Sequence, residues 1–224
     1  MNVIVLILAV IVGLIFYSQQ SVATANAMSR AARAARKPVA NRSGFGEALA
    51  VFGGALAGDA MWAAAALVIF YLAQQLAPAR VILSIVGSFF FLRLAWGALQ
   101  DARQGIMPRK DLATDKEAFQ SGAQISFKNP YALGFWLGAS AATLLLLSSA
   151  PGPLDFVLFF VGVIAGAALW SLLIAWLAAR QPAALSTGFF RTVNVLAGVV
   201  AALLGVAVLW ATVTQPVVAP PSEG

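Results

Sequence analysis

The stretch GALAGDAMW, residues 54–62, places a single carboxylate, Asp59, among residues that are otherwise small or apolar. It lies in the apolar run 48–76, and a bilayer needs a helix of about 20 apolar residues. An ionised carboxylate near the centre of a membrane is costly unless it is paired, hydrated or protonated. Asp59 is therefore a candidate for a transport pathway or a proton relay, and a merely structural polar residue is the alternative.

The composition extends this reading to the whole chain, because 61% of the 224 residues are hydrophobic and only 10% are charged. A soluble domain of this length cannot bury so much apolar surface. Further apolar runs cover residues 3–19, 81–99, 130–149, 156–179 and 190–213. The sequence predicts an all-α integral membrane protein with six transmembrane helices in a single membrane domain.

The chain contains no Cys and no His. Thiol–disulfide exchange, haem ligation by these residues and the usual zinc or copper sites are therefore excluded. No paired carboxylates occur near the predicted core, and the mixed charges of residues 101–118 are typical of a solvated loop. We expect no metal, no cofactor and no enzymatic activity.

The net charge of +6 arises from basic residues that gather in alternate loops. Twelve of them lie in or beside the odd-numbered loops, whereas the even-numbered loops contain only Arg80. Lys and Arg are retained in cytoplasmic loops, so this pattern indicates membrane topology and not nucleic acid binding. It predicts that both termini lie outside the cytoplasm and that residues 214–224, which contain three prolines, form a disordered external tail.

The first span permits a second interpretation, because Ala25-Asn26-Ala27 resembles a signal-peptidase site after an apolar core. Cleavage there would leave five spans. The arginines that follow oppose export of this region, and the segment before the apolar run has no basic side chain. Residues 21–43 are instead expected to form a cytoplasmic or interfacial amphipathic helix.

The opening stretch has a partner in GVIAGAALW, residues 162–170, with five of nine positions identical. The match aligns the second span with the fifth, so the repeat unit has three helices, residues 1–100 and then 119–213, joined by a cytoplasmic loop at 101–118. Two copies of an odd-helix unit cross the membrane in opposite senses, which predicts an inverted repeat.

Both copies contain the small-xxx-small spacing that lets helices approach closely, but only the first copy contains a charged residue. We expect a helix-packing role for Gly54 and Gly58, and for their counterparts Gly162 and Gly166. The position of Asp59 is occupied by Ala167 in the second copy.

Two further charges are candidate pathway groups. Arg93, inside the third span, either pairs with Asp59 or extends its side chain to the interface. Lys128 precedes Asn129 and Pro130 at the start of the fourth span, where proline favours a break in the helix. A break there would offer free N–H groups to an anion, and an ordinary interfacial lysine with a helix that starts at proline is the alternative.

Three stretches resemble the LysE/RhtB-type translocators, six-helix bacterial inner-membrane proteins that export amino acids. They are GALAGDAM, FQSGAQISFKNP at residues 119–130 and VGSFFFLRLAWGAL at residues 86–99. The resemblance implies that Asp59, Asn129 and Pro130 are pathway residues supported by Gly54 and Gly58. The first helix departs from the family, since Tyr17-Ser18-Gln19-Gln20 stands where the family has a Pro-Gly-Pro break.

From these observations we expect a multi-pass inner-membrane exporter of small amino acids or related metabolites, coupled to protons through Asp59 and working by alternating access. Its expected partners are the lipid bilayer and a small-molecule substrate, without nucleic acid, and a homo-oligomer is left open. The alternative is a non-transporting membrane subunit that packs against partner proteins through its glycine-rich helix faces.

Overall fold

The structure is a computed structural model that describes residues 2–34, 44–104, 118–127, 132–148, 150–181 and 184–214. In these ranges the chain forms seven helices and no strand, which confirms the all-helical prediction. The helices are α1 (Asn2–Ala34), α2 (Gly44–Ala73), α3 (Ala77–Gln104), α4 (Ala118–Phe127), α5 (Ala132–Leu147), α6 (Pro153–Arg180) and α7 (Thr187–Thr214).

Among the described residues, four helices are long and apolar enough to cross a membrane: Leu49–Ala73, Ala77–Gln104, Pro153–Leu177 and Thr187–Thr214. Two shorter apolar segments correspond to the remaining two apolar runs of the sequence. They are Asn2–Ser18, which is the first part of α1, and Ala132–Leu147, which is α5. The chain is a multi-pass membrane protein, and the described part of it supplies four candidate spans where the sequence predicted six.

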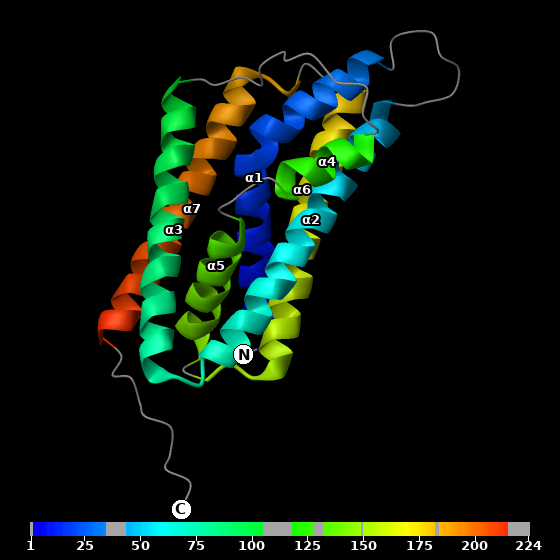
Figure 1. The fold of residues 1–224 in the computed structure, drawn as a ribbon. Helices are drawn as coiled ribbons and strands as arrows, with labels where there is room; N and C mark the ends of the chain where they lie inside the picture. Colours follow the sequence, from blue (N-terminus) through cyan, green and yellow to red (C-terminus); the bar gives the residue numbers. More distant parts are fainter. Residues whose placement is uncertain are drawn as a thin grey trace, which may run out of the picture.

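The long helices lie side by side, and α1 begins and α7 ends at the lower end of the bundle in Figure 1. The helix α3 packs mainly on α7, α1 on α6 and α4 on α2. Figure 1 also shows that α4 lies obliquely across the upper half, while α5 occupies the lower half. Together, α4 and α5 therefore extend over the same height of the bundle as one long helix.

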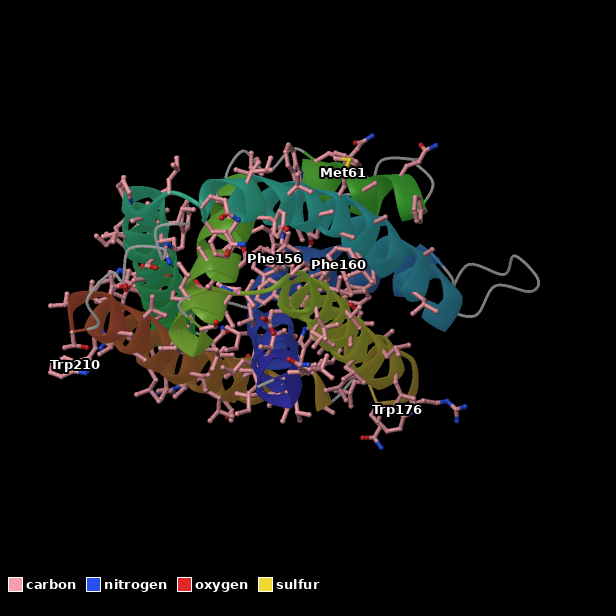
Figure 2. The ribbon with its side chains drawn as sticks, turned by 90° about the horizontal axis from the view of Figure 1, so that it is seen from below. Met61, Phe156, Phe160, Trp176 and Trp210 are labelled. Carbon is pink, nitrogen blue, oxygen red and sulfur yellow. The ribbon has the colours of Figure 1, made fainter. Side chains whose placement is uncertain are left out.

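The helix α5 lies at the centre of the bundle, and ten of its 16 residues are buried. It packs against α3 and α2, and its Phe135 and Trp136 belong to the main apolar core. Large apolar side chains cover the outside, and Figure 2 shows Met61, Trp176 and Trp210 at the surface, each 47% exposed or more. An apolar surface around a packed interior is what a lipid environment requires.

The start of α6 is fixed by local chemistry. Pro153 is the first helical residue, where its missing N–H has no intrahelical partner to lose. The Asp155 carboxylate accepts the backbone N–H of Gly152 at 2.9 Å, which satisfies a group that the helix itself leaves free.

The helix predicted over residues 21–43 is confirmed for residues 21–34, where it is the continuation of the first apolar run. The helix α1 continues without interruption from Asn2 to Ala34. Residues 35–43 and the expected tail after Thr214 lie outside the described ranges. A single helix is the outcome because the run 2–34 contains no proline and only one glycine to interrupt it.

Candidate transport site

Two glycines of the opening stretch bring α2 into direct contact with α4. A Cβ atom on Gly54 would overlap the carbonyl oxygen of Phe119, and one on Gly58 would lie 2.7 Å from the Cβ of Ser126. From the other side, a Cβ on Gly122 would overlap the carbonyl oxygen of Val51. The two backbones therefore approach as closely as glycine allows, and a larger residue at Gly54 or Gly58 would not fit without a shift of α4.

This close approach encloses Asp59, which is only 1% exposed. The hydroxyl of Tyr17, on α1, donates a hydrogen bond to Oδ2 of Asp59 at 2.8 Å. The hydroxyl of Ser126, in the last turn of α4, donates to Oδ1 at 2.6 Å. Each carboxylate oxygen thus accepts a hydroxyl, and charge-assisted bonds of this kind offset part of the cost of burying the group.

An aromatic cluster lies beside this polar group. The rings of Phe16 and Phe135 stack with centroids 4.2 Å apart, and Trp136 meets Phe16 edge-on at 4.7 Å. Phe16 also contacts its neighbour Tyr17, the hydroxyl donor of Asp59, at 5.9 Å. The carboxylate and the first two turns of α5 therefore belong to one continuous region where α1, α2, α4 and α5 meet.

The second glycine pair packs in the same manner on a different helix. A Cβ on Gly166 would overlap the carbonyl oxygen of Val10, and one on Gly162 would lie 2.6 Å from the Cβ of Ala9, both on α1. Ala167, the counterpart of Asp59, is completely buried. The repeated stretch thus makes a close helix contact in both places, with α4 in the first and α1 in the second.

At the lower end of the bundle, residues at the end of α2 and just after it contact residues at and just before the start of α6. The ring of Phe156 lies 5.2 Å from that of Phe70 and 5.4 Å from that of Tyr71. The side-chain amide of Gln74 donates to the carbonyl oxygen of Pro151 at 3.3 Å. Figure 2, seen from this end, shows Phe156 inside the bundle.

The structure does not bring Arg93 to Asp59, so of the two alternatives given for Arg93 the described residues do not show the pairing. Arg93 is exposed on α3, whereas Asp59 is enclosed by α1 and α4. The residues of α3 that face inward include Phe91 and Ala95. A residue two positions from Phe91 lies about 200° around the helix from it, which turns Arg93 outward.

Lys128, Asn129 and Pro130 lie outside the described residues. The described chain ends α4 at Phe127 and begins α5 at Ala132. The place of these three residues in the site stays a prediction.

Sequence comparison with known proteins identifies the family to which the chain belongs. The family model described as LysE type translocator matches residues 34–212, which is most of the chain. The chain belongs to the LysE-type translocator family. It is also similar to the "Chemotactic transduction protein ChpE" of Pseudomonas aeruginosa, with 29% identity over 139 residues, 60% of this chain and 68% of that protein. No solved structure matches the chain.

The match to the LysE-type translocators includes α2 to α7 but leaves out nearly all of α1. Tyr17 therefore lies in the helix that the match omits, whereas Asp59 and Ser126 lie within it. In the sequence, Tyr17 is notable only as part of the departure from the family, and Ser126 is not distinguished from the other serines. The available signals were a phenol inside an apolar span and a hydroxyl four residues before Pro130.

Proposed function

We propose that this LysE-type translocator exports small amino acids or related metabolites in exchange for protons, with Asp59 as the group that changes protonation. The observation that carries the proposal is a buried carboxylate whose two oxygens accept hydroxyls from two different helices. Intramembrane carboxylates are rare and mark substrate or proton pathways. Ser and Tyr hydroxyls both donate and accept, so the same pair can bond Asp59 whether it is ionised or protonated.

The proposed mechanism is alternating access between two inverted repeats of three helices each, α1 to α3 and then α4 to α7. The short helices α4 and α5 together form the first helix of the second repeat, which makes six crossings. Supporting this division, the glycines of α2 pack on the second repeat and those of α6 pack on the first. The contacts of Gln74 and Phe156 at the lower end would have to break for the site to open there.

The proposed orientation puts both termini outside the cytoplasm, in a bacterial inner membrane. It is supported by the basic loops and by the common end at which α1 begins and α7 ends. A reporter active only outside the cytoplasm is expected to be active after Gly224 and silent within residues 105–117. The reverse pattern would rule out this orientation.

The substrate is proposed to bind beside Asp59 at the junction of α4 and α5. Asp59 would face the substrate's ammonium group, and Lys128 or the start of a helix would receive its carboxylate. Asn129 and Pro130 would shape the junction, because proline prevents one continuous helix through it. Replacing Pro130 or Lys128 by Ala in the assay below tests these roles, and wild-type export by both variants would remove them from the site.

The deciding experiment measures uptake of the twenty radiolabelled L-amino acids into everted membrane vesicles under an imposed proton gradient. The wild-type protein is expected to transport at least one of them. Asp59→Asn keeps the size and hydrogen bonding of the side chain but cannot change charge, so it should abolish transport without loss of inserted protein. Asp59→Glu should retain partial activity, because the ionisable group survives with one more methylene. Wild-type rates in Asp59→Asn would end the case for a functional carboxylate.

The alternative is a non-transporting membrane subunit that packs against partner proteins. It is favoured by the continuous α1, which lacks the break expected for the family, and by the similarity to a protein named for chemotactic transduction. In that case no amino acid of the panel would be transported, and Asp59→Asn would leave the association with the partner proteins unchanged.

A further inference from the structure

The central helix α5 has a buried polar face. Trp136, Ser140 and Thr143 follow one another at the spacing that places residues on one side of a helix, and each is at most 1% exposed. The helix runs from the middle of the bundle to its lower end (Figure 1). The polar face therefore leads from the region of Asp59 toward that end, through an interior that is otherwise mainly apolar.

Two of these three side chains have no hydrogen-bond partner among the described residues. They are the indole N–H of Trp136 and the hydroxyl of Thr143. Ser140, between them, donates to the carbonyl oxygen of Leu137 at 3.1 Å. A buried donor without an acceptor destabilises a protein, so such a group calls for an explanation outside the folded chain's own contacts.

The surroundings of Trp136 indicate the chemistry that its N–H would recognise. The indole packs against Phe16 and Phe135, and Phe16 precedes the tyrosine that bonds Asp59. Helical side chains lean toward the N-terminus of their helix, so the indole leans toward the start of α5, where the helix dipole favours negative charge. An indole N–H can only donate, so the group that it binds must be an acceptor.

We infer that Trp136 binds the carboxylate of the transported amino acid through its indole N–H, and that the polar face of α5 continues the path toward the lower end. The inference rests on the proposed export function and names a residue of that same site. Asp59 and Trp136 then define two poles, one for the ammonium group and one for the carboxylate. The exported molecule is an α-amino acid, and a simple amine lacks the second contact.

The test uses Trp136→Phe, which removes the N–H and keeps an aromatic ring. Its matched control is Trp170→Phe, because Trp170 on α6 is another buried indole whose N–H has no partner in the described chain. The probe is the radiolabelled L-amino acid with the highest wild-type rate in the panel. Trp136→Phe is expected to raise its KM roughly ten-fold, the effect of one hydrogen bond to a charged group, with no fall in thermal stability. Trp170→Phe should leave KM unchanged.

Thr143→Val tests the path, since valine has nearly the same shape and lacks the unpaired hydroxyl. If Thr143 were only structural, the variant would be as stable as the wild type or more so, and would transport at the same rate. The inference predicts equal or higher stability together with a several-fold lower maximal rate. An unchanged rate would overturn the continuation of the path along α5.

A second measurement needs no variant. The decarboxylated amine of the probe is expected to compete with it at least ten-fold more weakly in the wild-type protein. Equal competition by the amine, or a KM for Trp136→Phe within two-fold of the wild-type value, would overturn the carboxylate contact while leaving export intact. Absence of transport for every amino acid of the panel would instead refute the proposed function.

Discussion

The stretches 54–62 of α2 and 162–170 of α6 have the same packing but different chemistry. Each places two glycines so that a neighbouring helix backbone comes within the space of a Cβ atom. The neighbour is α4 in the first case and α1 in the second. The first stretch continues with Asp59 and the second with Ala167, both of them buried. Helix packing and the polar group are therefore separable features of one motif.

The surroundings of the two positions differ as well. Asp59 accepts hydroxyls from α1 and α4, whereas at the second position the hydroxyl of Ser171 donates to the backbone carbonyl oxygen of Ala167 at 2.7 Å within α6. A carboxylate in the second stretch would lack the two donors that the first has. The asymmetry thus involves three helices and not one residue, which supports a site at the first stretch.

The largest loss of stability is expected from variants that disrupt the close glycine contacts, which the two stretches share. Gly54→Ala and Gly166→Ala should each lower the unfolding free energy by about 3 kcal/mol, because the new Cβ would meet backbone that cannot move aside cheaply. Thermal unfolding in detergent measures the loss.

The matched control for Gly54 is its neighbour Gly53, where an added Cβ would meet only ring carbons of Phe119 at 3.9 Å, an ordinary contact. Gly53→Ala should be neutral or up to about 1 kcal/mol stabilising, since alanine is the better helix former. Equal stability of the Gly53 and Gly54 variants would show that the close approach of α2 to α4 does not constrain the fold.

A smaller loss of stability is expected from removing the hydroxyl groups that donate to Asp59, a feature of the first stretch alone. Tyr17→Phe and Ser126→Ala each remove one donor to Asp59, and each should cost about 1.5 kcal/mol while reducing transport less than Asp59→Asn does. In the Asp59→Asn background the same changes should cost less, because the charge that strengthens the bond is gone. Ser171→Ala is the control, since its hydroxyl bonds within its own helix. Costs that are identical in both backgrounds would argue against hydrogen bonds to an ionised Asp59.

The sequence predicted well what depends on composition and local repetition. Apolar runs coincide with six of the seven described helices but not with α4, and the two stretches that match in five of nine residues both lie at close helix contacts. Tyr17 and Ser126 were missed because their bonds to Asp59 join residues 42 and 67 positions apart, and the register between helices decides them. Ser and Tyr also occur elsewhere in the apolar helices, so their presence alone does not identify a site.

Arg93 shows a different limit, because its depth along α3 was predictable from the sequence but the choice between an inward and an outward direction was left open. The small residues Gly87, Ala95 and Ala98 on α3 are buried and follow the helical period, so they mark the face that packs. This face leaves Arg93 on the outer side of α3. A charge in a membrane span indicates a pathway only when it faces the interior.

The smallest effect on transport and stability is therefore expected from replacing Arg93, which is exposed, whereas Asp59 is buried. Arg93→Leu should change the transport rate by less than two-fold and leave stability equal or slightly higher, because leucine suits an exposed membrane position better than a cation does. Combined with Asp59→Asn, it should give additive changes in unfolding free energy, within about 0.5 kcal/mol, as expected for side chains that do not touch. A buried ion pair would behave otherwise, since losing Asp59 alone would strand a cation that Arg93→Leu then removes. A coupling above about 1 kcal/mol would mean that Arg93 reaches Asp59 in another conformation, and the second charge would return to the pathway.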